Sequence, residues 1–307
     1  MKKVIGFGAL NVDFIFKVEN LNLEENPAYP VDVQAGGNAA NTIAALAKLG
    51  IKCGFVGVVA SDLYGKLILS ELKKHKVNTS QITIRQTANS QVTSGIVETF
   101  FDKKGKRHLF VKPGVNSSLT EKEVDKNNFD SASIVHLTSF VQDQQFEIQK
   151  QLAATISSSV KISFAPGSLY CHRGLSQLEP IIKKTYILFL AQKEIYYLTG
   201  KSYRNGVGKL LDIGPKIVVV TLGASGCYVA TSKKQILVPA KKVKVTDTTG
   251  AGDSLTAGFL YGLLNNYSIK KCAEIGNAMG SFSVQNIGAR AGLPNRKELS
   301  SVVSLPK

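Results

Sequence analysis

DTTGAGDSLTAGFLYGLL, residues 247–264, places two glycines and one carboxylate immediately before an apolar run. Because glycine disfavours a helix interior, this stretch predicts a bare turn followed by a helix that begins near Gly252 and Asp253. The N-terminus of a helix carries unpaired N–H groups and a partial positive charge, which attract anions. Glycines let a phosphate approach the backbone because no Cβ atoms intervene. Residues Gly250, Ala251 and Gly252 therefore form a predicted anion hole.

Asp253 gives this turn a possible chemical role. A carboxylate beside an anion hole repels a phosphate, unless it takes a proton from the hydroxyl that attacks the phosphate. This division of tasks is typical of phosphoryl transfer, so Asp253 is a candidate general base. The same residues are also compatible with a glycine-rich turn in which Asp253 only caps the helix.

The composition of the 307-residue chain is that of an ordinary globular protein, with 44% hydrophobic and 20% charged residues. Its formal net charge of +16 is high. The lysines and arginines are dispersed, often in pairs, and no basic tail, zinc-finger spacing or RNA-binding aromatic signature accompanies them. We therefore interpret the charge as a solvated surface and expect no nucleic-acid partner.

Cysteine usage and hydropathy indicate the compartment. The four cysteines (Cys53, Cys171, Cys227 and Cys272) lie far apart without a CxxC spacing, which predicts free thiols in a reducing environment. The sequence contains no run of about 18 apolar residues, so we expect no membrane partner. These features predict a cytoplasmic protein.

Strand-like and helix-like segments alternate along most of the chain. Short apolar strands between helices predict an α/β fold with three layers, in which a mostly parallel sheet is covered by helices on both faces. The predicted strands are residues 2–10, 53–60, 133–139, 160–166, 186–191 and 216–223. The predicted helices are residues 38–50, 63–76, 144–158, 175–184, 193–200, a helix that starts at about 252, and 269–285. We expect one domain over residues 1–307.

Two segments interrupt this alternation, at about residues 12–34 and 93–112. Both alternate apolar and polar residues without an intervening helix, and the second contains the turn DKKGK at residues 102–106, which predicts a β hairpin. Two-stranded ribbons are marginally stable alone. We therefore expect the two ribbons to form a small β lid that is stabilised by the main domain, by substrate or by a partner subunit.

Two long motifs resemble the signatures of the ribokinase-like sugar kinases, also called the phosphofructokinase B family. DTTGAGDSLTAGFL resembles the C-terminal signature, and AGGNAANTIAALAKLG at residues 35–50 resembles the N-terminal one. GALNVD (8–13), KPGVN (112–116), VTLGASG (220–226) and NAMGSFSVQNIGA (277–289) follow the family's order, so the resemblance covers essentially the whole chain. It implies a ribokinase-like fold, ATP and Mg²⁺ as cofactors, and phosphorylation of a hydroxyl of a small, ribose- or fructose-like sugar.

The resemblance also implies roles for individual residues. For catalysis it implies Asp253 as general base, with Gly250, Ala251, Gly252 and the Asp253 amide around the anion hole. For sugar binding it implies Asn11, Asp13, Gly36, Gly37 and Asn41. For the nucleotide it implies Thr221, Gly223, Gly226 and Asn277. Glu194 would order Mg²⁺ through water, and Asp247 would lie near a monovalent cation such as K⁺. The lid would cover the sugar and join a homodimer.

The sequence departs from the family pattern at two positions. Ala191 stands where relatives commonly have the Asn of an Asn-x-x-Glu motif, and Ala165 stands where they often have Asn or Asp. Other functions stay open: a nucleoside kinase of the same fold, a kinase of a phosphorylated sugar, which the basic charge favours, or a degenerate kinase that binds a ligand or nucleic acid, which the +16 charge and Ala191 suggest. The intact Gly250–Asp253 motif argues against loss of catalysis.

Overall fold

The computed structural model describes residues 3–87, 92–103 and 106–305. The strands of its large sheet are β1 (Lys3–Phe7), β4 (Lys52–Ala60), β5 (Asn78–Arg85), β8 (Ile134–Thr138), β9 (Lys161–Ala165), β10 (Thr185–Ala191), β11 (Ile217–Thr221), β12 (Cys227–Ala230) and β13 (Gln235–Val238). Their order is β13-β12-β11-β10-β9-β8-β1-β4-β5. All neighbouring strands from β11 to β5 are parallel. Beyond β11, β12 and then β13 continue the sheet as antiparallel strands.

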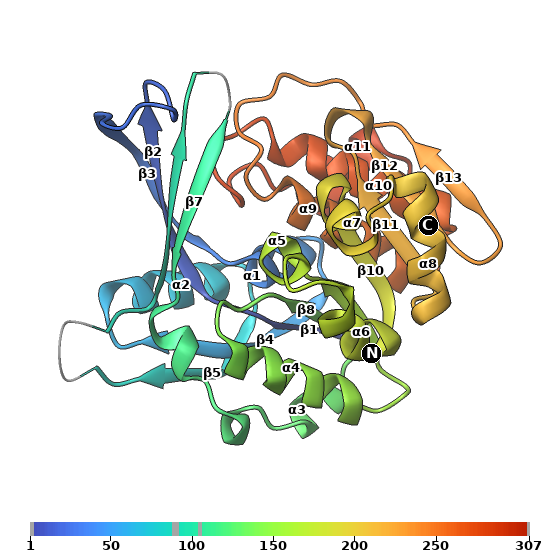
Figure 1. The fold of residues 1–307 in the computed structure, drawn as a ribbon, viewed down its shortest axis with the longest axis horizontal. Helices are drawn as coiled ribbons and strands as arrows, with labels where there is room; N and C mark the ends of the chain where they lie inside the picture. The colour runs from blue at the N-terminus through green and yellow to red at the C-terminus, as the bar shows by residue number, and fades with distance from the viewer. Residues whose placement is uncertain (1–2, 88–91, 104–105, 306–307) are drawn as a thin grey trace.

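Helices cover both faces of this sheet (Figure 1). One face packs against α1 (Asn38–Lys48), α2 (Leu63–Lys74), α9 (Ala251–Leu264), α10 (Ile269–Ser283) and α11 (Arg296–Val302). The other packs against α3 (Asn127–Asp130), α4 (Asp143–Thr155), α5 (Gly167–Cys171), α6 (Leu175–Lys184), α7 (Gln192–Thr199) and α8 (Tyr203–Ile213). Each face has its own apolar core, since successive strand side chains point to opposite faces. The prediction of a three-layer α/β fold is confirmed.

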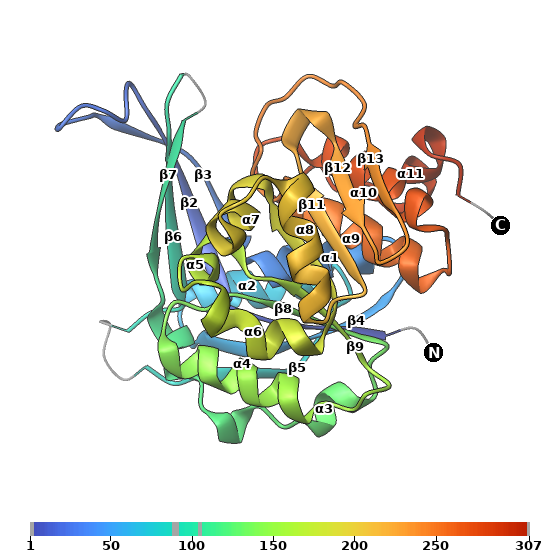
Figure 2. The same ribbon diagram turned by 45° about the vertical axis from the view of Figure 1, so that its right-hand side comes forward.

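The two predicted ribbons fold as antiparallel pairs and form a separate small sheet. Its strands are β2 (Asn11–Val18), β3 (Ala28–Gly36), β6 (Gly95–Phe101) and β7 (Arg107–Lys112), in the order β3-β2-β6-β7. The parallel pair β2–β6 joins the ribbons. Residues 104–105 of the predicted turn lie outside the described residues. Figures 1 and 2 show this sheet rising from one side of the main body.

The connections place several glycine-rich and polar turns at one edge of the large sheet. Short 3₁₀ helices follow β7 and β11: η1 (Gly114–Ser118), η2 (Glu121–Glu123) and η3 (Gly223–Ser225). The carboxyl ends of β1, β10 and β11 lie at the same edge because these strands run in parallel within one sheet. In open α/β sheets, ligands bind outside this edge. Among the described residues, no helix combines the length and apolar character needed to cross a lipid bilayer.

Candidate active site

The turn before α9 is shaped to receive an anion. Gly250 is the N-cap in a left-handed conformation, with φ of 71°, and a Cβ there would lie 2.5 Å from the Cβ of Ala289. Only glycine fits without strain. At Gly252, in contrast, a Cβ would meet no atom within 4 Å, so the space above this residue is open. In the described part of the chain, no side chain caps the first turn of α9. The amides of that turn have no partner one turn earlier in the helix, although Ala251 makes a long 3.3 Å contact to the Thr248 carbonyl.

Asp253 lies in the first turn of α9 with one oxygen already held. The side-chain amide of Asn41, from α1, donates to its Oδ2 at 2.9 Å, and the Thr42 hydroxyl donates to its backbone carbonyl at 3.3 Å. Burial removes water from the carboxylate and raises the pKa of Asp253 to about 6, against the lowering effects of the Asn41 hydrogen bond, Arg290 and Arg107. A carboxyl with a pKa near neutrality can accept and return a proton at physiological pH, as a general base must.

Asp13 forms the opposite wall of the site. It lies on β2 beside Gly36 of β3, where a Cβ would come within 2.2 Å of the Asp13 Oδ2, so Gly36 provides the room for this carboxylate. Burial raises the pKa of Asp13 to about 7, and the nearby Asp253 raises it further while Arg290 lowers it. The two predicted acids are therefore brought together, although they are 240 residues apart in the chain.

The other predicted sugar-side residues surround this pair. Asn11 is buried, and its side-chain oxygen accepts from the Asn116 amide at 3.1 Å. Asn116 also donates to the carbonyl and accepts from the amide of Leu10, which explains the asparagine of the KPGVN motif. Gly37 is the N-cap of α1 with φ of 97°, and a Cβ there would lie 2.3 Å from the Ala9 carbonyl. Asn11, Gly36, Gly37 and Asn41 thus meet where the small sheet joins the main body.

Arg290 is the functional candidate that the sequence did not reveal. Its side chain is 7% exposed, its Nε donates to the Asn41 Oδ1 at 2.9 Å, and its Nη2 donates to the Gly36 carbonyl at 3.2 Å. Burial lowers its pKa to about 10, against the opposing effects of Asp13, Glu71 and Asp253. The only available signal was a basic residue in the otherwise small and apolar stretch that follows NAMGSFSVQNIGA.

The predicted nucleotide-side residues form a second group, at the ends of β11 and β12. Thr221 ends β11, and Gly223 and Gly226 follow it with φ of 58° and 92°. A Cβ at Gly226 would lie 2.1 Å from the Val238 carbonyl, whereas Gly223 faces open space. Asn277 is buried, and its amide donates to the carbonyls of Val238 and Pro239 at 2.8 and 3.3 Å. It ties α10 to the end of β13, so its contacts in this structure are structural.

The two predicted metal-site residues have different surroundings. Glu194 accepts from the Ala191 amide at 2.8 Å and from the Ser168 hydroxyl at 3.4 Å, and burial raises its pKa. Asp247 accepts from the amide and hydroxyl of Thr249 and from the amide of Gly288 at 2.8 to 2.9 Å, so it joins the loops before and after α9–α10. Within the described ranges, no cluster of three or more His, Cys, Asp or Glu side chains could hold a metal ion.

The small sheet contacts the loops around the anion hole at two points. The guanidinium of Arg107, on β7, donates to the Thr249 hydroxyl at 3.4 Å and lowers the pKa of Asp253. Gln34, on β3, donates to the Ile287 carbonyl at 3.3 Å and lies so close to Gly288 that a Cβ there would come within 1.7 Å of its side-chain oxygen. Both ribbons therefore reach the site.

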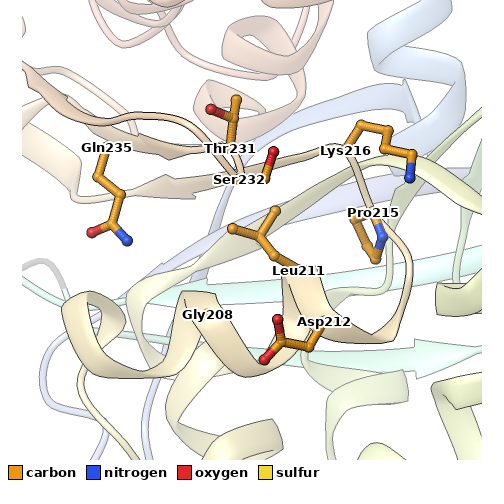
Figure 3. Close-up of a pocket in the computed structure, with 8 residues that line it drawn as sticks. All are labelled: Gly208, Leu211, Asp212, Pro215, Lys216, Thr231, Ser232 and Gln235. Carbon is orange, nitrogen blue, oxygen red and sulfur yellow. The ribbon is translucent and has the colours of Figure 1, made fainter.

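A separate cavity of about 320 Å³ lies elsewhere, between the end of α8 and the β12–β13 turn (Figure 3). It is lined by Gly208, Leu211, Asp212, Pro215, Lys216, Thr231, Ser232 and Gln235. These residues precede β11 or follow β12, at the amino end of β11, opposite the edge that carries Thr221. The cavity contains none of the candidate site residues, so we do not assign the site to it.

Comparisons with known proteins identify the family of the chain and its fold. The sequence pattern of the pfkB family carbohydrate kinases matches residues 1–296. The chain is 34% identical to an uncharacterised sugar kinase of Archaeoglobus fulgidus over 249 residues, which cover 81% of this chain and 98% of that relative. It is 29% identical to an ATP-dependent ribose-1-phosphate kinase of Halopiger xanaduensis, with 95% of each chain covered. The crystal structure of the Methanocaldococcus jannaschii nucleoside kinase superposes with a TM-score of 0.83, with 27% identity over 98% of this chain and 97% of that one. The resemblance drawn from the two sequence signatures is confirmed.

Proposed function

The chain belongs to the pfkB family of carbohydrate kinases, and on this basis we propose that it transfers the terminal phosphoryl group of ATP to a hydroxyl of a small sugar at the Asp253 site. The observation that supports this proposal best is the meeting of Asp253 and Asp13 at the open N-terminus of α9. One acid is beside the anion hole and the other faces it from the small sheet. A phosphoryl acceptor between them would contact both.

The proposed reaction balances with these two acids. Asp13 in its ionised form accepts hydrogen bonds from sugar hydroxyls and orients the acceptor, with Asn11 beside it. Asp253 takes the proton of the attacking hydroxyl as the new bond between sugar oxygen and phosphorus forms. The bond between the terminal phosphorus and the bridging oxygen breaks, and ADP leaves with that oxygen. The amides at the start of α9 stabilise the negative charge of the transferring group.

We propose Mg²⁺ as the second cofactor, because the charge of a triphosphate requires a counter-ion. Glu194 fits a role through water, since its partly exposed carboxylate makes one short hydrogen bond, from the Ala191 amide at 2.8 Å, while its other oxygen accepts only a long one from Ser168 at 3.4 Å. A monovalent cation fits Asp247 less well in this conformation, because both of its oxygens accept protein hydrogen bonds. K⁺ at this position stays a prediction. A bound magnesium ion would neutralise phosphate charge, while the protein groups position the acceptor.

An ATP-consumption screen tests the proposed activity. The purified protein is assayed with ribose, fructose, nucleosides, sugar acids and sugar phosphates, and Asp253→Asn serves as the inactive variant. Loss of a positioned base lowers turnover by about 10² to 10⁴-fold, while the variant should stay folded and bind ATP like the unchanged protein. If no acceptor of these classes supports ATP consumption, or if Asp253→Asn keeps most of the activity, the proposal is wrong and a binding role becomes the better explanation.

A kinase of an anionic sugar is the second candidate, and Arg107 favours it. This arginine extends from β7 to Thr249, immediately before the anion hole, and its side chain is solvent-exposed enough to meet a ligand. A guanidinium at the mouth of the site matches a phosphate or carboxylate on the acceptor. Nucleosides and neutral sugars offer no such group. The anionic acceptors in the same screen therefore separate the two candidates.

We further propose that two copies associate through the small sheet. This sheet exposes several large apolar side chains: Tyr29, Val31, Val33, Leu109 and Phe110. Covering them in a homodimer would remove apolar surface from water. Light scattering of the protein and of Phe110→Asp measures this directly, and a monomer in both cases would contradict it. The four free and buried cysteines fit the cytoplasmic location expected from the sequence.

A further inference from the structure

Arg290 is a buried charged residue beside both acids of the site. It is in the loop after α10, it is almost completely buried, and it contacts α1 through Asn41 and β3 through the Gly36 carbonyl. Its third nitrogen, Nη1, is buried without a hydrogen-bond partner among the described residues. A buried charge with an unsatisfied donor is costly. An arginine kept only for packing would be better replaced by an apolar residue.

The contacts of Arg290 fix the orientation of the Asn41 amide. A guanidinium can only donate hydrogen bonds, so the group of Asn41 that faces the Arg290 Nε at 2.9 Å must be its carbonyl oxygen. The NH₂ group of Asn41 then points the other way, toward the Asp253 Oδ2 at 2.9 Å. With the amide reversed, its oxygen would face the carboxylate and its NH₂ would face the guanidinium. Both contacts would then be repulsive.

We propose that Arg290 is a positioning residue for the phosphoryl transfer: it orients Asn41, so that Asn41 holds one oxygen of Asp253 and leaves the other oxygen to take the proton of the acceptor hydroxyl. This inference rests on the proposed function, because it assigns Asp253 the role of base. It adds a residue whose hydrogen bonds go to Asn41 and to the Gly36 carbonyl. It also connects the sugar side of the site to the base, since Arg290 binds the backbone of Gly36 beside Asp13.

The charges around Asp253 predict a specific consequence of losing Arg290. Asp253 is near Arg290, Arg107 on β7, Glu194 on α7 and Asp13 on β2. Arg290 in turn is near Glu71 and His75 at the end of α2. Arg290 and Arg107 favour the ionised base, whereas the two acids oppose it. Without Arg290, Asp253 should bind its proton more tightly, so the acid limb of the activity profile should move to higher pH.

Three substitutions separate the charge of Arg290 from its hydrogen bonds. Arg290→Met removes both, Arg290→Gln keeps an N–H donor for Asn41 without charge, and Arg290→Lys keeps charge and one donor. We measure kcat/KM against pH for the acceptor found in the screen. Arg290→Met should lower kcat/KM about tenfold or more at pH 7, which is a part of the 10² to 10⁴-fold contribution of a positioned base. The midpoint of its acid limb should move about one pH unit higher, as expected when a nearby positive charge is removed. Arg290→Gln should show the same shift of the acid limb to higher pH with a smaller loss of kcat/KM. Arg290→Lys should leave the midpoint pH of the acid limb unchanged.

The double-variant cycle with Asn41→Ala distinguishes positioning from simple stability. If Arg290 acts through Asn41, the loss that Arg290→Met causes in the plateau of kcat/KM above the acid limb should largely disappear when Asn41 is already absent, whereas the shift of the acid limb, which comes from the charge, should persist. Arg85→Gln is the matched control, because Arg85 forms a partly buried ion pair with Glu123 outside the site, at 2.8 Å. It should lower the urea unfolding midpoint and leave the pH profile unchanged.

Some results would overturn the inference while the proposed function stands. An active protein whose Asp253→Asn variant is inactive, but whose folded Arg290→Met variant has an unchanged acid limb, would exclude a role of Arg290 in tuning the base. Additive losses in the cycle would exclude action through Asn41. If Arg290→Met does not fold, Arg290→Gln supplies the same comparison. If Asp253→Asn is itself active, the proposed function fails first and Arg290 loses its assigned target.

Discussion

The buried carboxylate of Asp13 should lower the free energy of unfolding of the free protein, although it serves sugar binding. Its pKa rises from 3.8 to about 7, mainly because burial disfavours the carboxylate, and this value already includes the attraction of Arg290. The folded state thus holds the proton more tightly than the unfolded chain. The resulting penalty is small below pH 4, grows as the pH rises toward 7, and is constant above that. The difference corresponds to on the order of 4 kcal/mol at pH 8, as an upper value, because the carboxyl is partly hydrated.

Asp13→Asn resembles the neutral form of this residue and should therefore be more stable than the unchanged protein at pH 8. We expect a gain of about 1–3 kcal/mol at pH 8 that shrinks to almost nothing at pH 4. Urea unfolding at both pH values measures it, and Asp32→Asn on the exposed neighbouring strand is the control. The same variant should lose sugar binding, because an amide carries no charge and replaces one accepting oxygen of the carboxylate with an NH₂ donor. An Asp13→Asn protein that is less stable at pH 8 than at pH 4, relative to the unchanged chain, would refute a buried, energetically unfavourable carboxylate.

Further variants and one exchange experiment test other parts of the site. Gly36→Ala places a Cβ 2.2 Å from the Asp13 carboxylate, which must then rotate away. The KM for sugar should therefore rise about tenfold or more, with little change in the KM for ATP or in stability. An equal change in both KM values would contradict this. Arg107→Ala should lower kcat/KM about tenfold for anionic acceptors and leave neutral ones unaffected, since one charge-assisted contact contributes about 1.5 kcal/mol or more; equal losses for both classes would place Arg107 on the transferred phosphate instead. Amides of β2, β3, β6 and β7 should exchange with deuterium more slowly when sugar binds than with ATP alone. Equal protection with and without sugar would mean that the small sheet does not move.

The repeating parts of the fold were predictable because local sequence determines them. The helix at residues 38–50 carries apolar side chains at helical spacing and ends at Gly50, and the structure has α1 from Asn38 to Lys48. The second ribbon was predictable for a related reason, since buried and less buried positions alternate along β6, although β7 in the same ribbon is mostly exposed. In each case the pattern reflects one face that must be buried, which the chain shows without its tertiary contacts.

Elements that depend on tertiary packing were missed. α8 contains Gly206 and Gly208, which lower helix propensity, yet a Cβ at Gly206 would lie 2.6 Å from the Thr199 hydroxyl of α7. Glycine is needed there for close packing of two helices, not for a turn. The last two strands of the sheet, β12 and the edge strand β13, have four residues each, too few for a clear alternation. β5 follows α2 with only one buried residue and half of its positions exposed, so its apolar content gives little signal.

The same distinction explains which site residues could be found. Local motifs contain Asp253, Asp13 and Asn41. Several glycines of these motifs stand where the backbone allows no Cβ atom, and such motifs are recognisable in one sequence. Arg290 has no such context, because its function depends on Asn41, 249 residues earlier, and on the Gly36 carbonyl. A buried charge is favourable only when its partners satisfy it in three dimensions. The residue that orients the base is therefore visible only after the small sheet, α1 and the loop after α10 are brought together, which is also why its substitution should alter the pH profile and not merely the stability.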